Sequence, residues 1–272
     1  MTRRDFAAKC LKELSMTSLR DFQPELIEII FTDIDGTLTL DGRLPESSYQ
    51  ALWRLHHAGK KVIPVTGRPA GWCDLIARFW PVHGVVGENG GLLYRYDGKK
   101  MRRHEFISTQ ERRGHRESLK KIAREVRNQV PKARIAADQF SRRFDLAIDF
   151  AEDVQPALTM HEIQLIKTIF EKHGAHAKIS NIHVNGWFGD YDKLSACKWY
   201  CREWLNLDLG KNQSKVAYVG DSPNDEPMFA FFKNSFAVAN VREFLPQMKY
   251  HPAYITKAKE GLGFVELIKQ IV

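Results

Sequence analysis

Cysteine is scarce in this chain of 272 residues, which contains only four. Cys10, Cys73, Cys197 and Cys201 are too few and too scattered for the disulfide framework of a secreted protein, so we expect a reducing, cytoplasmic environment. The spacing of Cys197 and Cys201 would place both on one face of a helix. Because no second pair follows at ligand spacing, we interpret them as buried helix thiols rather than metal ligands.

Long apolar runs are also missing. No stretch approaches the roughly 18 apolar residues of a membrane-spanning helix. Asp5, Lys9 and Glu13 interrupt the first residues, where a signal peptide needs an apolar run, so we expect neither a membrane partner nor export. There is no internal repeat, and a composition of 43% hydrophobic and 27% charged residues excludes a disordered chain.

Positive charge is concentrated in one region. The chain has 41 Lys or Arg against 33 Asp or Glu, a net charge of +8. Residues 95–143 contain 16 Lys or Arg and 6 Asp or Glu, a net charge of +10, so the rest of the chain is slightly acidic. A basic surface attracts nucleic acid, anionic lipid or a phosphorylated small molecule, and charge alone does not distinguish these partners.

Two parts of the chain alternate short apolar runs with amphipathic segments. The apolar runs predict strands at residues 26–33, 61–67, 84–87, 215–221 and 235–239. The periodic segments predict helices at 1–25, 45–59, 69–80, 190–206, 224–232 and 264–271. This alternation predicts an α/β fold, in which a parallel sheet is flanked by helices.

The pattern differs between these two parts. A hairpin is expected over residues 90–107, with its turn at Asp97-Gly98. Helices are expected at 111–130 and 156–173, and strands near 132–137, 145–150, 176–180 and 182–188. We therefore divide the chain into a core of residues 1–86 and 188–272 and an inserted α+β cap of residues 87–187.

Polar and acidic residues follow the predicted core strands. They are Asp33 and Asp35, then Thr66-Gly67-Arg68, and then Asp221-Ser222-Pro223-Asn224-Asp225. Because ligands of open parallel sheets bind at the carboxyl ends of the strands, we expect these residues at one edge of the sheet. Four carboxylates there would repel one another, and Mg²⁺, which prefers hard oxygen ligands, would relieve the repulsion.

In combination, these motifs resemble those of a known superfamily. The segments Asp33-Ile34-Asp35-Gly36-Thr37, Thr66-Gly67-Arg68, Lys193 and Gly220-Asp221-Ser222-Pro223-Asn224-Asp225 resemble the four ordered motifs of the haloacid dehalogenase superfamily of phosphohydrolases. An insertion between the second and third motifs resembles the C2-type cap of class IIB, which includes many sugar-phosphate phosphatases. The resemblance spans about residues 26–240 and implies a Rossmann-like core with a C2B-type cap.

The resemblance implies a Mg²⁺-dependent phosphatase acting on a small phosphorylated metabolite, by analogy a sugar phosphate. Asp33 would be the nucleophile that forms an aspartyl-phosphate, and Asp35 the general acid and base. The metal would be held by the Asp33 carboxylate, the Asp35 backbone carbonyl and Asp221, with Asp225 orienting Lys193 or a metal-bound water at the same site.

The remaining motif residues would bind the phosphoryl group. The resemblance assigns the hydroxyl of Thr66 and the amide near Gly67 to phosphoryl oxygens and Lys193 to a fixed positive charge, while Asn224 shares the orienting role of Asp225. Leu194 follows Lys193 where the superfamily commonly has glycine, so Lys198 and Lys215 are alternatives.

Other candidates have both a functional and a structural explanation. Arg68 contacts substrate or pairs with an acid. Glu88 and Asn89 face the cleft from a hinge at residues 87–91, or belong to a linker turn. A cluster near the return to the core suits sugar hydroxyls or strand packing; it comprises His183, Asn185, Trp187, Asp190 and Tyr191.

The basic segment around 112–127 has three explanations: a solvated helix, a funnel for an anionic substrate and, third, a nucleic-acid surface. Two alternative functions follow. One is a phosphomutase or phosphotransferase of the same superfamily. The other is a non-catalytic scaffold that binds RNA or another polyanion, against which the clustered carboxylates argue.

Overall fold

A five-stranded parallel sheet forms the core of the computed structural model, which describes residues 22–272. The strand order is β12-β11-β10-β1-β2, and every pairing is parallel. The strands are β1 (Ile29–Thr32), β2 (Lys61–Pro64), β10 (Val216–Gly220), β11 (Asn234–Ala237) and β12 (Tyr254–Ile255). The flanking helices are α2 (Glu46–His57), α3 (Ala70–Phe79), α6 (Lys193–Leu205), α7 (Glu226–Phe231) and α8 (Glu260–Ile271).

These elements confirm the predicted α/β core, with two local differences. Strand β12 was not predicted because it is only two residues long, and α8 begins at Glu260, four residues before the expected start. Most of the helix predicted over residues 1–25, including Cys10, lies outside the described residues. At its end, the structure has a short 3-10 turn at Pro24–Leu26. No helix in the described part of the chain is long and apolar enough to cross a membrane.

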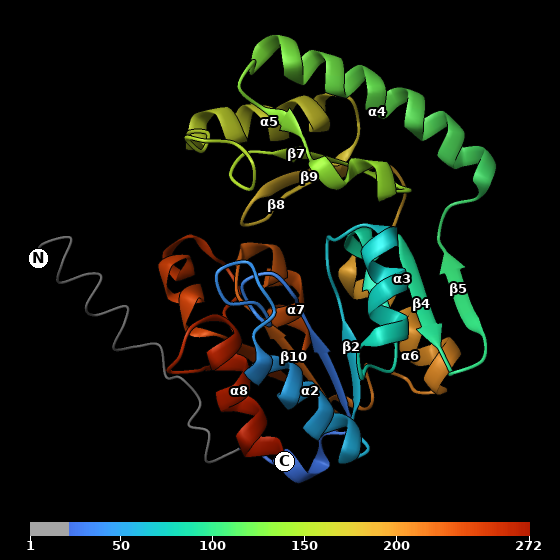
Figure 1. Cartoon of the computed structure of the whole chain (residues 1–272), viewed down its shortest axis with the longest axis vertical. Helices are drawn as coiled ribbons and strands as arrows, with labels where there is room; N and C mark the ends of the chain where they lie inside the picture. The colour runs from blue at the N-terminus through green and yellow to red at the C-terminus, as the bar shows by residue number, and fades with distance from the viewer. Residues whose placement is uncertain (1–21) are drawn as a thin grey trace, which may run out of the picture.

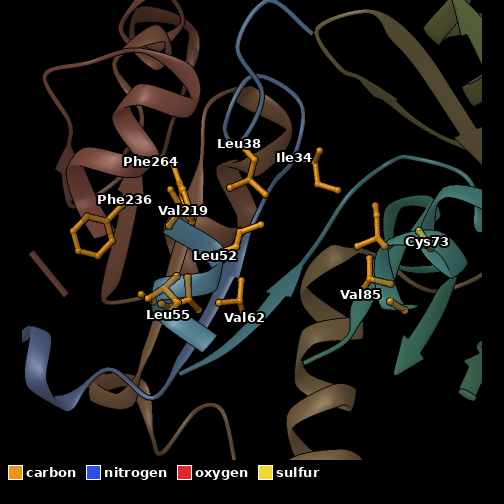
Figure 2. Packing of buried hydrophobic residues seen from close by; sticks show 14 of the residues in the cluster. Ile34, Leu38, Leu52, Leu55, Val62, Cys73, Val85, Val219, Phe236 and Phe264 are labelled. Atoms are coloured by element: carbon orange, nitrogen blue, oxygen red, sulfur yellow. The ribbon is translucent and has the colours of Figure 1, made fainter. Parts of the chain in front are cut away.

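Alternate residues of the buried strands pack against opposite helix layers. Ile30, Val62 and Val219 contribute to a cluster that also contains residues of α2 and α8 (Figure 2). Their neighbours Ile29 and Phe31 belong to a second cluster that contains residues of α6 and α7. Because both faces of the sheet are covered, its strands are mostly apolar, as their sequences indicate. Cys197 and Cys201 are buried in the second cluster, which confirms them as helix thiols.

A small antiparallel sheet extends the core beyond β2. It comprises β3 (Val85–Gly87), β4 (Leu92–Tyr96) and β5 (Met101–Glu105), and β3 touches the parallel sheet through the Val65–Val86 bridge. The β4–β5 hairpin was expected in the cap, but its backbone hydrogen bonds join it to β3. This pairing favours a boundary near residue 107, rather than the predicted one at residue 87, for the point where the chain first passes from the core into the inserted region.

The second antiparallel sheet and two helices form a separate layer, which we call the lid. It contains α4 (Thr109–Gln129), β6 (Arg134–Ile135), β7 (Asp145–Asp149), α5 (Met160–Lys172), β8 (His176–Ile179) and β9 (His183–Trp187). The sheet order is β6-β7-β9-β8, and α4 and α5 pack on its face away from the core (Figure 1). Capping boxes at Ser108 and Thr159 fix the starts of both helices.

Glu88 joins the core to the lid. Its side chain is fully buried, and its two carboxylate oxygens accept backbone N–H bonds from Ala70 at 2.9 Å, Arg143 at 2.9 and 3.0 Å and Phe144 at 2.6 Å. Burial, reinforced by nearby Asp145, raises the pKa of Glu88 to about 7, although the backbone donors oppose the shift. The expectation that Glu88 faces the cleft is therefore wrong, because its carboxylate is used to hold backbone amides.

The turn after Glu88 packs tightly on the start of α6. Glu88 and Asn89 have φ values of 45° and 56°, and Gly90 has a φ of 110°. A Cβ atom on Gly90 would lie 2.2 Å from the carbonyl oxygen of Asp192, so only glycine fits there. Segments 87–91 and 192–193 are thus held together next to the crossing between core and lid.

We expect Glu88→Gln to destabilise the protein by about 2–3 kcal/mol, because an amide NH₂ would face backbone N–H groups that have no other acceptor. Urea unfolding measures the loss. Glu171→Gln, which removes an exposed carboxylate, is the matched control and should change the unfolding free energy by less than about 0.5 kcal/mol. Equal stability of the two variants would contradict this role of Glu88.

Candidate active site

The predicted motif residues meet at the carboxyl edge of three adjacent strands. Because β10, β1 and β2 are neighbours in the sheet, Asp221, Asp33 and the Thr66–Arg68 turn follow strands that end side by side. The backbone N–H of Asp33 donates to the carbonyl of Val219 at 2.8 Å, which fixes Asp33 beside the end of β10. The structure thus brings together residues that are almost 190 positions apart.

Lys193 enters this edge from the first turn of α6. A capping box at Asp192 and Ser195 sets the start of the helix. The ammonium Nζ of Lys193 lies 3.2 Å from Oδ1 of Asp33 and 2.9 Å from Oδ1 of Asp225, with only 8% of the side chain exposed. Burial alone would lower the pKa of Lys193, but the carboxylates of Asp225 and Asp33 outweigh it and raise the pKa.

The two alternative lysines lie elsewhere. Lys198 contacts the ring of Phe231, and Lys215 pairs with Glu28 at 2.8 Å, before the start of β1. Lys193 is therefore the lysine that the fold presents to Asp33, despite the Leu194 that follows it.

Three buried carboxylates form a potential cation site. One oxygen from each of Asp33, Asp221 and Asp225 lies within 4.8 Å of the others. Burial raises the pKa of Asp33 to about 7, with contributions from Asp225 and Asp35, and burial and the other carboxylates also raise the pKa of Asp221. Such crowded oxygen donors fit a hard divalent cation such as Mg²⁺, which would offset their repulsion.

Asp225 is the least available of the three. Its Oδ1 accepts from Lys193 and from the Tyr218 hydroxyl at 2.6 Å, and its Oδ2 accepts from the backbone N–H of Asp221 at 3.0 Å. These bonds occupy both oxygens of Asp225 and hold the ammonium of Lys193 beside it. Asp33 and Asp221 remain as the carboxylates with freer oxygens, since Oδ1 of Asp221 has only a long contact of 3.4 Å with Thr37.

Asp35 is paired with Arg68. The guanidinium donates through Nε to Oδ2 at 2.9 Å and through Nη2 to Oδ1 at 2.8 Å. Arg68 is buried, which alone would lower its pKa, but Asp35 and Glu152 raise it. Of the two explanations for Arg68, the structure shows pairing with an acid, and that acid is the site residue Asp35.

Some of the phosphate-binding candidates line one cavity. Gly67, Asn89 and Asn224 line it together with Asp33 and Asp35. Asn89 is buried, and its Nδ2 has no hydrogen-bond partner within residues 22–272. The Thr66 hydroxyl is fully buried and accepts from the backbone N–H of Arg68 at 3.0 Å, so it also shapes the turn.

The lid closes this cavity to a volume of about 30 Å³. Arg142 donates to the carbonyl of Gly67 at 2.8 Å, and Asn181, in the β8–β9 turn, donates to Oδ2 of Asp221 at 3.0 Å. Glu152, in the loop after β7, accepts from Arg68 at 3.0 Å. Sequence reasoning missed these three residues, because none follows a core strand or belongs to a motif.

The cluster expected near the return crossing divides in two. His183 and Asn185, on β9, line the cavity beside Asp33. Trp187, Asp190 and Tyr191 border a different cavity, and Trp187 donates to the carbonyl of Tyr191 at 3.2 Å. Trp187 is buried in the core cluster and also lines a further cavity that includes Lys193, whereas His183 and Asn185 line the cavity beside Asp33.

The basic helix α4 does not line this cavity. Arg112 pairs with Glu105, and Lys120 pairs with Glu117. Arg112, Arg116 and Lys120 border another cavity, of 180 Å³, on the lid. Among the described residues, the basic side chains of α4 thus lie outside the cavity beside Asp33.

Known proteins resemble this chain in sequence and in fold. At the sequence level, the chain is 28% identical over 250 residues to a phosphoglycolate phosphatase of Pyrobaculum neutrophilum, covering 90% of this chain and 96% of the relative. It is 27% identical to a phosphoglycolate phosphatase of Methanobrevibacter smithii, covering 90% and 99%.

Two solved structures show the same fold. A Thermoplasma acidophilum protein matches with a TM-score of 0.70 at 19% identity, covering 90% of this chain and 98% of that one. The sucrose-phosphatase of Synechocystis matches with a TM-score of 0.60 at 14% identity, covering 89% and 97%.

The family profile described as haloacid dehalogenase-like hydrolase matches residues 30–139 and 148–268. These ranges include each motif that follows a core strand, together with Lys193 and most of the lid. With the motif residues gathered at one sheet edge, the match identifies this chain as an enzyme of the haloacid dehalogenase-like hydrolase family.

Proposed function

We propose that this protein is a Mg²⁺-dependent phosphatase that hydrolyses the monoester of a small phosphorylated metabolite through an aspartyl-phosphate on Asp33. The observation that carries the proposal is the position of Asp33, whose carboxylate lies against Lys193 and beside Asp221 in a buried site. The phosphatase names of the relatives support the same reaction.

The chemistry divides into two displacements. A carboxylate oxygen of Asp33 attacks phosphorus, and the ester P–O bond breaks. Asp35, which must leave its pair with Arg68 and be protonated for this step, gives its proton to the departing alkoxide. Asp35 then takes a proton from the attacking water, which releases inorganic phosphate and restores Asp33. When bound by Asp33, Asp221 and the Asp35 backbone carbonyl, Mg²⁺ supplies positive charge between nucleophile and phosphate.

Phosphoryl oxygens would be held by groups that the fold already positions. Lys193 contributes a fixed positive charge because Asp225 holds its ammonium. Asn89 offers an unused N–H₂ group, and the Thr66 hydroxyl and the turn at Gly67 lie at the same strand end. Asn224 also lines the cavity.

The leaving group would contact the lid, and we propose a sugar phosphate as substrate. The lid residues that line the cavity are mostly neutral and polar, with Ser180, Asn181, His183 and Asn185 among them, and such groups suit hydroxyls. A cavity of 30 Å³ is too small for a sugar, so the lid must move to admit it. The relatives named phosphoglycolate phosphatase make phosphoglycolate the second candidate.

We expect Asp33→Asn to lower phosphate release from a generic aryl phosphate by about 10⁴-fold or more, because an amide cannot attack phosphorus. Phosphate release measured with Mg²⁺ gives the result. Asp74→Asn, at an exposed ion pair, is the control and should keep full activity. Activity of Asp33→Asn at the level of the unchanged protein would refute the mechanism.

Metal removal tests the second part of the proposal. We expect EDTA to abolish activity and added Mg²⁺ to restore it, and Asp221→Asn to weaken Mg²⁺ binding more than about tenfold in calorimetry. Asp190→Asn alters an exposed carboxylate near the lid and should bind Mg²⁺ normally. Unchanged Mg²⁺ affinity in Asp221→Asn would exclude this residue as a ligand.

A further inference from the structure

The guanidinium of Arg68 is surrounded by carboxylates from both the core and the lid. Asp35 occupies Nε and Nη2, and Glu152 accepts from Nη1 at 3.0 Å. Asp138 lies 3.8 Å from the same Nη1. The guanidinium of Arg68 thus faces three carboxylates. Asp35 belongs to the core, and Asp138 and Glu152 belong to the lid.

Glu152 is held in place from two sides. Its Oε1 accepts from Arg68, and its Oε2 lies 2.9 Å from Nε2 of His183, a contact short enough for an ion pair but poorly aligned for a hydrogen bond. The contact with His183 lowers the pKa of Glu152 to about 2. Burial alone would raise this pKa, and Arg68 also lowers it. Both Arg68 and His183 line the cavity next to Asp33, so Glu152 contacts two side chains that border the space for the leaving group.

The other arginine of this cavity is neutralised as well. Arg142 donates to Asp138 at 2.9 Å and to Asp145 at 3.1 Å, in addition to the Gly67 carbonyl. Both arginines among the described lining residues are therefore already paired. A leaving group that carries its own carboxylate finds no unpaired guanidinium here.

We propose that Glu152 is a specificity-determining residue that disfavours substrates whose leaving group carries a carboxylate and favours neutral, hydroxylated ones. The inference rests on the proposed phosphatase activity and narrows its substrate class. A carboxylate near Arg68 must displace Glu152 or lie beside it, whereas a hydroxyl donates a hydrogen bond to Glu152 and leaves the contact between Glu152 and Arg68 intact. Like charges this close in a partly buried site cost enough to change binding about 10-fold to 100-fold.

Two esters that differ only at this point provide the test. These are 2-hydroxyethyl phosphate, which is neutral beyond the phosphate, and 2-phosphoglycolate, in which a carboxylate replaces the CH₂OH group. We expect the unchanged protein with Mg²⁺ to have a higher kcat/KM for the neutral ester. In Glu152→Gln, the preference ratio should fall at least about tenfold, mainly through a lower KM for phosphoglycolate.

Asp153→Asn is the matched control, because it removes a carboxylate from the same exposed loop without a contact to Arg68. Its ratio should stay within twofold of the unchanged protein. Inhibition by inorganic phosphate should be similar in all three proteins, which checks that the phosphoryl site is intact. Glu152→Ala replaces Glu152→Gln if the latter does not fold.

The outcomes separate the two proposals. An unchanged ratio in Glu152→Gln, or an equal fall in Asp153→Asn, overturns the role of Glu152. If the unchanged protein releases phosphate from neither ester nor from an aryl phosphate, the proposed function fails instead. In that case the affinities of the two esters, measured by calorimetry, decide the role of Glu152. We expect the ratio of these affinities to fall at least about tenfold in Glu152→Gln.

Discussion

The ion pair of Lys193 with Asp33 and Asp225 is the interaction on which the site depends. Three buried carboxylates meet at one sheet edge, and burial makes their negative charge costly. Lys193 supplies a positive charge within 3.2 Å of two of them. The bonds that fix Asp225, from Tyr218 and a backbone amide, therefore also set where Lys193 and Asp33 lie.

The lid is tied to the core by polar contacts. Glu88 collects backbone amides of the lid, Arg142 donates to the Gly67 carbonyl, and Asn181 reaches Asp221. The contacts of Arg142 and Asn181 end on the two turns that carry the candidate phosphate and metal residues. Closure of the lid and the arrangement of those turns are thus physically connected, and a substrate that enters must exchange some of these bonds for its own.

The effect of charge in this protein depends on where the charged residues lie. The net +8 of the chain and the basic α4 suggest affinity for polyanions, yet α4 borders a cavity of its own. Inside the candidate site, Arg68 and Arg142 are balanced by carboxylates. Selectivity there depends on which of these pairs a leaving group can join, so the residues around Arg68 matter more than the total charge.

The sequence by itself determined the alternating core, the strand ends that carry Asp33, Thr66 and Asp221, and the presence of a lid, because strand periodicity and motif order are local properties. It did not determine that β4 and β5 pair with β3, that Glu88 is a buried tether, or that Glu152 meets Arg68 across 84 positions. Those contacts depend on how the lid docks on the core. Only the tertiary structure decides them, since hydrogen bonds between distant segments leave no pattern in either segment alone.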